Sequence, residues 1–407
     1  RLAASRPHPA HLTEFYLWMA FGGALGGAFT ALVVPLIFDS TRDYLMMVVI
    51  ACFLRPTLKL MRPRRRLELR NIAIVILPAM FLLVASKNDL ETHKLLGVSS
   101  LWIICFVAGV VVVSLMTDAL RFGLAIAAIA VVGHLLQATR AVLYADRSFY
   151  GIYRVARAPG STTMLYHGTT IHGAQFTDRA RRLTPITYYH PAGPVGDVFR
   201  ELAPSLKGAD IGVVGLGTGS ILCYSRPGER WTFFEIDPKV EEIARDERFF
   251  TYLSDCEVDP AIVFGDARLT IASEPQGKYS LLVLDAFSSD AIPVHLLTRE
   301  AIETYFRALV EDGVLMVHIS NRRLDLEPVV ADLALDAGLE ARVRNHSVSE
   351  ARQDTEYDYE SDWVIVARRL EDFGPLASDT MWVELEPSLK KRPWTDDYSN
   401  ILSVIRR

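Results

Sequence analysis

Long runs without a charged residue dominate the first third of the chain. The longest, Phe15–Phe38, has 24 consecutive uncharged residues, and about 20 helical residues are enough to cross the hydrocarbon core of a bilayer. Shorter runs with at most a histidine follow at Tyr44–Leu54, Asn71–Ser86, Leu101–Met116 and Phe122–Ala138. We therefore predict a helical membrane domain of four to five spans over residues 1–138. The alternative for the shorter runs is a buried core helix.

Two basic segments near these runs indicate which side of the membrane the neighbouring parts of the chain occupy. Arg55–Arg70 holds seven basic residues and a single acid, Glu68, and such loops face the cytoplasm. Arg140–Arg182 is also basic, although three predicted spans separate the two segments, so the span count stays open. We expect a multi-pass protein of the inner membrane, with the lipid bilayer as a partner and residues 139–407 on the cytoplasmic side.

Composition excludes other classes of partner and site. The net charge is −5, which gives no overall attraction to nucleic acid. The four cysteines (Cys52, Cys105, Cys223 and Cys256) lie far apart, so we expect neither a metal site nor a disulfide framework, which fits a reducing compartment or a membrane. Three histidines, His167, His172 and His190, match no zinc-binding spacing. No metal is expected.

Residues 139–407 read as an α/β unit. Ser148–Ala156 and Thr162–His167 favour a small β platform over residues 139–190. Helix-like stretches separate most of the later strand-like runs, which favours a mostly parallel sheet covered on both faces over residues 191–407. The seven predicted strands are Asp210–Val214, Trp231–Ile236, Ala261–Phe264, Ser280–Leu284, Gly313–Ile319, Leu339–Arg344 and Asp362–Ala367.

A glycine loop follows the first of these strands. Gly215, Gly217 and Gly219 would let a ligand touch the backbone at a helix start. By itself this pattern also fits a tight strand-to-helix turn. The next strand ends in Glu235-Ile-Asp237, where a carboxylate can accept both hydroxyls of a ribose. The third ends in Gly265-Asp266-Ala267, where the acid can bind an adenine amino group. Together they predict an adenosine site at the carboxyl ends of a sheet.

The fourth strand ends in Asp285, and the loop Ala286–Leu297 follows it. With these motifs in this order, about residues 148–370 resemble the spermidine synthase (aminopropyltransferase) family, and specifically its membrane-fused branch. The resemblance implies a Rossmann-like fold of the class I methyltransferase type behind a small N-terminal β platform. It also implies a sulfonium nucleoside as substrate, either S-adenosylmethionine or its decarboxylated form. A homodimer is a further expectation, since sheet-bearing relatives commonly pair.

The resemblance implies roles for individual residues. The glycines and Glu235 would hold adenosine and ribose, Asp266 with Ala267 would contact adenine, and Asp285 would help to deprotonate the attacking amine. Further candidates are Gln175 and either Tyr188 or Tyr189 near the aliphatic arm of the substrate, with Asp237 and Asp290 as additional substrate-binding acids. Asp290 can also be read as a helix cap or a solvated loop residue.

One departure from the family bears on the acceptor. No carboxylate lies between Asp178 and Asp197, where classical members hold a diamine, and a dication that leaves water needs anionic partners. Basic residues near Arg181 suit a substrate that keeps its carboxylate. The leading hypothesis is therefore a membrane-anchored enzyme that releases 5′-methylthioadenosine without a classical diamine acceptor, as in a lyase that yields homoserine lactone. Alternatives are a polyamine aminopropyltransferase, a methyltransferase and a non-catalytic membrane sensor of adenosyl sulfonium.

Overall fold

The computed structural model describes residues 6–40, 42–54, 94–95, 98–99, 109–110, 112–113, 115–116, 118–137, 142–158, 160–287, 293–387 and 392–406. The chain divides into two compact units, Arg1–Phe149 and Tyr150–Arg407. Each unit is described by itself.

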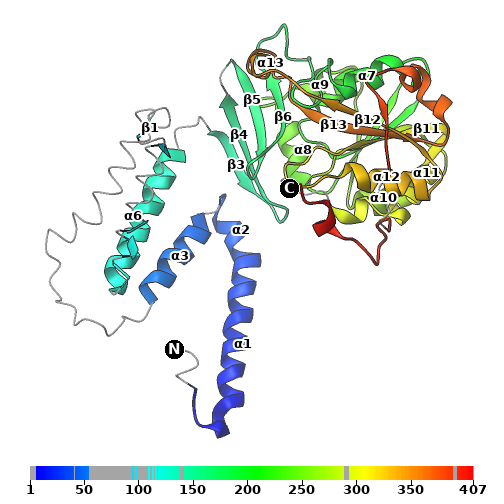
Figure 1. Cartoon of the computed structure of the whole chain (residues 1–407). Coiled ribbons are helices and arrows are strands. Elements are labelled where there is room, and N and C mark those ends of the chain that lie inside the picture. Colours follow the sequence, from blue (N-terminus) through cyan, green and yellow to red (C-terminus); the bar gives the residue numbers. More distant parts are fainter. Residues whose placement is uncertain are drawn as a thin grey trace. The chain divides into compact units, whose positions relative to one another are not determined.

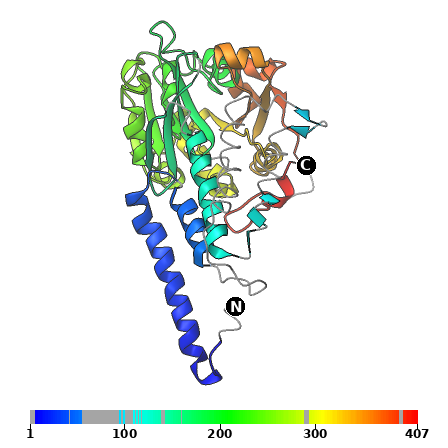
Figure 2. The same cartoon turned by 90° about the vertical axis from the view of Figure 1, so that its left-hand side faces the viewer.

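The first unit contains one long apolar helical stretch near the N-terminus. It runs through η1 (Pro9–His11), α1 (Leu12–Ala28), η2 (Phe29–Val33) and α2 (Val34–Ile37), and is drawn in blue in Figures 1 and 2. Gly22, Gly23, Gly26 and Gly27 have no atom near the position of a Cβ, and Leu17 and Trp18 are exposed. Phe15–Phe38 thus forms the helix expected of it, apart from its last residue.

The prediction of a multi-span membrane domain is wrong. Within the described part of the chain, only Pro9–Ile37 is long and apolar enough to cross a membrane. Tyr44–Leu54 lies in α3 (Arg42–Leu54), which has 13 residues and is too short for a span. Phe122–Ala138 falls largely in α6 (Ala119–Gln137), which adds only the shorter apolar stretch Ala119–Val131. Asn71–Ser86, and most of Leu101–Met116, lie outside the described residues.

The remaining elements of the first unit are short. The strands β1 (Lys94–Leu95) and β2 (Val98–Ser99) pair with each other antiparallel, and β3 (Val142–Arg147) ends the unit. The side chain of Phe53 on α3 lies against Gly123 of α6, so these two helices pack together. Arg147 forms an ion pair with the buried Asp43, with Nη1 and Oδ1 3.1 Å apart.

The second unit begins with an antiparallel platform of β4 (Ile152–Ala158), β5 (Thr162–His167) and β6 (Thr170–Phe176). Its buried side chains include Met164, Ala174 and Phe176, which pack with Ile186 and Tyr357 in a small core. The predicted platform strands are therefore present, with β6 as an addition.

An eight-stranded mixed sheet forms the centre of the second unit, in the order β14-β12-β13-β11-β10-β7-β8-β9. Five neighbouring strands are parallel, while β13, β12 and β14 run antiparallel to their neighbours. The strands are β7 (Asp210–Val214), β8 (Arg230–Glu235), β9 (Ala261–Phe264), β10 (Tyr279–Leu284), β11 (Leu309–His318), β12 (Glu340–His346), β13 (Ser361–Ala367) and β14 (Val383–Glu384). All seven strands predicted after the platform are present and the unit is α/β, but its sheet is mixed, with three antiparallel pairings.

Helices cover both faces of this sheet. Figure 1 shows α10 (Ala267–Ala272), α11 (Arg299–Ala308) and α12 (Glu327–Asp336) together on one face and α7 (Pro194–Glu201) on the other. The main core lies between the first group and the strands and includes the fully buried Tyr279, Leu282 and Tyr305. Shorter elements connect the strands: η3 (Ser220–Tyr224), α8 (Pro238–Ala244), α9 (Tyr252–Asp255), η4 (Val294–Leu296), α13 (Glu350–Glu356), η5 (Leu370–Ser378) and η6 (Ile401–Val404).

Candidate active site

A cavity of about 290 Å³ opens at the carboxyl ends of the parallel strands, the place where open α/β sheets bind ligands. One part is lined by Gly215–Gly217, Glu235, Ile236 and Gly265–Ala267. The other part is lined by Tyr150, Tyr153, His167, His172, Tyr188, Asp285 and Phe287. Most of the predicted adenosine residues therefore share one cavity with the predicted catalytic acid Asp285, whereas Gly219 and Asp237 do not line it.

The glycine loop depends on glycine for two reasons. Gly215, Gly217 and Gly219 have φ values of +94°, +53° and +79°, which side chains rarely adopt. In addition, a Cβ on Gly215 would lie 2.3 Å from the carbonyl oxygen of Asp285, and one on Gly217 would lie 2.6 Å from that of His172. The loop is therefore pressed against both the fourth-strand acid and the platform.

Glu235 is held in place by backbone amides. Its Oε2 accepts a hydrogen bond from the N–H of Leu216 at 2.9 Å, and its Oε1 accepts from Ile236 at 2.8 Å and Asp237 at 3.0 Å. Burial raises the pKa of Glu235 in spite of these bonds, which favour the ionised form. The carboxylate lines the cavity and has lone pairs left for hydroxyl donors.

The other two strand-end acids occupy helix caps. Asp237 caps α8 by accepting from the N–H of Lys239 at 3.0 Å and does not line the cavity. Asp266 accepts from the N–H of Leu269 at 3.1 Å at the start of α10 and also lies 2.9 Å from Nε2 of His295. Asp266 and Ala267 both line the cavity, so of the two acids only Asp266 is placed to meet a ligand.

Asp285 is held by two side chains, Tyr189 and His318. The hydroxyl of Tyr189 donates to its Oδ2, and Nδ1 of His318 lies 2.6 Å from its Oδ1. Burial by itself would raise the pKa of Asp285, but the charge of His318 and the hydrogen bonds from His318 and Tyr189 outweigh it and hold the pKa below its ordinary value. Asp285 is therefore ionised at neutral pH.

His318 is a site residue that sequence reasoning missed. Its ring stacks on Trp363, with centroids 4.4 Å apart, and on Tyr188 at 4.9 Å. Its Nε2 lies 2.7 Å from the hydroxyl oxygen of Ser320, so both ring nitrogens are engaged. The available signal was strand order: β10 and β11 are parallel neighbours with Leu284 beside Val317, so the residues that follow, Asp285 and His318, meet at one edge.

The two candidate tyrosines differ in position. Tyr188 lines the cavity, and burial, followed by the charge of Asp285, raises its pKa well above the ordinary value. Tyr189 is turned to Asp285 and does not line the cavity, and burial followed by the same charge raises its pKa well above the ordinary value too. Both phenols are therefore neutral. Tyr188 faces the cavity, and Tyr189 orients Asp285.

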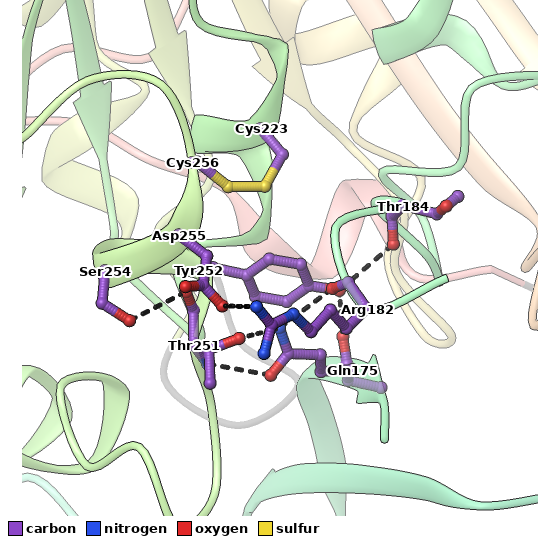
Figure 3. The surroundings of a disulfide bond; sticks show 10 residues. Gln175, Arg182, Thr184, Cys223, Thr251, Tyr252, Ser254, Asp255 and Cys256 are labelled. Atoms are coloured by element: carbon purple, nitrogen blue, oxygen red, sulfur yellow. Dashed lines mark hydrogen bonds and ion pairs between the residues drawn. A yellow bond between two sulfur atoms is a disulfide. The ribbon is translucent and has the colours of Figure 1, made fainter. Parts of the chain in front are cut away.

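Gln175 lies away from the cavity lining, next to a disulfide bond (Figure 3). Its amide nitrogen donates to Thr251 Oγ1 at 3.0 Å and to the carbonyl of Arg182 at 2.9 Å, while its Oε1 accepts from the N–H of Thr251. These bonds use the polar atoms of Gln175 to join the platform to the segment before α9.

The disulfide joins Cys223 to Cys256, 33 positions later in the sequence. The expectation of no disulfide is therefore wrong. Cys223 lies in η3 after the glycine loop and Cys256 follows α9 directly, and their Cα atoms are 5.0 Å apart, within the usual span of a disulfide. Cysteine spacing along the chain could not reveal this approach.

Two further sequence-based expectations concern charge near the arm of the substrate. Arg181 pairs with Asp178, and Arg182 pairs with Asp255, and neither arginine lines the cavity. Asp290 lies outside the described residues.

Comparison with known proteins points to the same class as the resemblance. No family model matches the chain. A polyamine aminopropyltransferase from Vibrio vulnificus is 36% identical over 111 residues, which are 26% of this chain and 36% of that protein. The chain thus spans about a third of the length of the curated relative it matches.

Solved structures of spermidine synthases are also similar, at lower identity. A probable spermidine synthase from Corynebacterium glutamicum gives a TM-score of 0.46 at 12% identity, covering 64% of this chain and 97% of that one. The enzyme from Thermotoga maritima gives 0.41 at 17% identity, covering 61% and 80%. A spermidine synthase in complex with the transition-state analogue AdoDATO gives 0.41 at 16% identity, covering 61% and 80%. The sequence match supports a spermidine synthase-like transferase.

Proposed function

We propose that this chain transfers the aminopropyl arm of decarboxylated S-adenosylmethionine to an amine and releases 5′-methylthioadenosine. The observation that carries the proposal is the shared cavity of Glu235, Asp266 and Asp285. Two of these carboxylates suit a nucleoside, and the third lies where the aliphatic arm of that nucleoside would extend. The match to a polyamine aminopropyltransferase supports the same activity.

The charge of the cavity supports the decarboxylated donor. Among the described residues that line it, three are carboxylates and none is a lysine or arginine. The carboxylate of intact S-adenosylmethionine would be buried there without a cationic partner, which is unfavourable. A donor with a sulfonium and an ammonium group is instead attracted. The lyase hypothesis needed a substrate carboxylate beside basic residues, so this geometry lends it no support.

The chemistry is a displacement at carbon. The acceptor nitrogen forms a bond to the carbon of the arm that is attached to sulfur, the carbon–sulfur bond breaks, and its electron pair stays on sulfur as a neutral thioether. The acceptor loses one proton, for which the ionised Asp285 is the adjacent acceptor. Tyr188 faces the same space, where its ring can stabilise the sulfonium. Positioning of the two reactants supplies much of the rate.

The amine acceptor would lie on the aromatic side of the cavity. That side is lined by Tyr150, Tyr153 and Phe287. Among the described residues, Asp285 supplies the carboxylate there. This composition suits an amine with one charge close to Asp285 and an apolar remainder. Polyamines are among the acceptors that we propose, since the curated relative is named a polyamine aminopropyltransferase.

Product analysis tests the proposal. The full chain is incubated with decarboxylated S-adenosylmethionine and, one at a time, with a monoamine, a diamine and spermidine. We expect methylthioadenosine together with one aminopropylated amine. Formation of S-adenosylhomocysteine from intact S-adenosylmethionine would instead indicate methyl transfer, and methylthioadenosine from the intact donor without an amine would indicate a lyase.

Two aspartate variants separate catalysis from folding. Asp285→Asn should lower kcat by at least about a hundredfold while methylthioadenosine still binds. Asp312→Asn changes an exposed aspartate in the same way and should leave turnover unchanged. Unaltered turnover in Asp285→Asn would contradict the assigned role.

A further inference from the structure

His172 on β6 lines the cavity and carries a buried polar atom without a partner in the described part of the chain. The residue is one of the lining residues, and its Nε2 is buried without a hydrogen-bond partner among the described residues. Buried polar atoms in folded proteins nearly always have a partner, and leaving one unpaired is unfavourable. An unpaired nitrogen on a residue that lines a ligand cavity therefore indicates a contact that a ligand completes when it binds.

The backbone around His172 places it between the two halves of the cavity. The carbonyl oxygen of His172 lies against Gly217, and the adjacent Gly173 lies against the side chain of Thr218, so this strand touches the glycine loop. On the other side, His172 is near enough to Asp285 and His318 for their charges to act on it. A sulfonium nucleoside held by the glycine loop would extend its arm past this ring toward Asp285.

The ring is uncharged at neutral pH. Burial, followed by the charge of His167, lowers the pKa of His172 to about 4, and Asp285 opposes this shift only in part. The ring centroids of His167 and His172 are 5.3 Å apart, and burial lowers the pKa of His167 as well. A neutral imidazole does not repel an ammonium group and accepts one hydrogen bond.

We propose that His172 determines donor specificity: its Nε2, with the ring proton on Nδ1, accepts a hydrogen bond from the terminal ammonium group of the aminopropyl arm. The assignment rests on the proposed function. An ammonium is preferred to a carboxylate because the described lining contains acids but no lysine or arginine. His167 is less suited, since its Nε2 already lies 3.2 Å from the carbonyl oxygen of Tyr150.

Calorimetry with two ligands that differ in the arm tests this assignment. Methylthioadenosine has the nucleoside without the amine, and decarboxylated S-adenosylmethionine has both. In His172→Phe we expect affinity for the decarboxylated donor to fall about tenfold, or about 1.4 kcal/mol, while affinity for methylthioadenosine stays within about twofold. His172→Gln, whose amide oxygen can accept the same bond, should recover most of the loss. His190→Phe makes the same exchange at a histidine outside the lining and should leave both affinities unchanged.

The possible failures are distinguishable. Equal losses for both ligands in His172→Phe, or no loss for either, would overturn the role of His172 and leave the proposed function standing. Failure of the unaltered protein to bind either ligand would overturn the proposed function itself. If His172→Phe does not fold, His172→Leu measured against His172→Gln decides the question by the same ratio.

Discussion

The Nδ1 atom of His318 lies 2.6 Å from the Oδ1 atom of Asp285, and both side chains are buried. Asp285 follows β10 directly and His318 is the last residue of the neighbouring parallel strand β11. The phenol of Tyr189 binds the second carboxylate oxygen of Asp285. This arrangement fixes the orientation of the acid and keeps it ionised.

His318→Gln should shift the pH dependence of activity. The charge of His318 helps to lower the pKa of Asp285, whereas burial raises it. Without that charge the pKa rises, so the acidic limb of kcat/KM should move to higher pH. In the unaltered protein the depressed pKa contributes stability that is present above the unfolded pKa and is lost as the pH falls through the folded pKa. The variant should therefore also be less stable at pH 7, which urea denaturation measures. An unshifted acidic limb would contradict this prediction, and His190→Gln serves as the control.

Gly215→Ala should destabilise the protein and weaken nucleoside binding. The new Cβ would lie 2.3 Å from the carbonyl oxygen of Asp285 at φ +94°. Gly208→Ala is the matched control, because it has a φ of +72° with nothing within 4 Å. Gly208→Ala should lose about 1 kcal/mol of unfolding free energy from backbone strain alone. We expect Gly215→Ala to lose more by about 1–3 kcal/mol, as measured by urea denaturation. Equal losses would show that the close approach to Asp285 is unimportant.

Glu235→Gln should weaken methylthioadenosine binding by about 1–3 kcal/mol. An amide presents an N–H group to backbone donors that now face carboxylate oxygens, and it accepts ribose hydroxyls less well. Calorimetry of the variant measures the loss, and the exposed Glu247→Gln is the control. Retained affinity would exclude Glu235 from nucleoside binding.

Reduction should lower the thermal stability of the second unit. The bond between Cys223 and Cys256 closes a loop of 33 positions, for which the chain-entropy relation gives about 3–4 kcal/mol as an upper value. We expect dithiothreitol to lower the Tm of the protein and to leave that of the Cys223→Ser/Cys256→Ser variant unchanged. Cys52 is a free thiol, so Cys52→Ser should keep the full sensitivity. An insensitive Tm in the unaltered protein would contradict a stabilising disulfide.

Strand-end residues were the part of the site that sequence could reveal. Glu235, Asp266 and Asp285 follow apolar strands, and parallel strands bring such residues to one edge. His318, the last residue of β11, obeys the same rule but was missed. Gln175 was assigned by resemblance alone, and motif position cannot show that its amide is used by Thr251.

The first unit shows what the sequence could not reveal, namely how many membrane spans the uncharged runs form. A run of uncharged residues measures composition, whereas a span needs an unbroken helix of sufficient length. Phe15–Phe38 meets both conditions almost to its end, while α3 covers Tyr44–Leu54 with only 13 residues. The pairing of Cys223 with Cys256 likewise depends on how two distant turns meet in space, which spacing along the chain does not encode.

The acidic lining of the cavity has a consequence for turnover. In the proposed reaction, transfer of the arm would turn a doubly cationic donor into an uncharged nucleoside and leave the new positive charge on the lengthened amine. The attraction of Glu235, Asp266 and Asp285 for the positive charges of the donor would therefore be lost when the carbon–sulfur bond breaks, whereas hydrogen bonds to the nucleoside would remain. The product nucleoside should therefore bind less tightly than the donor, so that fresh donor displaces it.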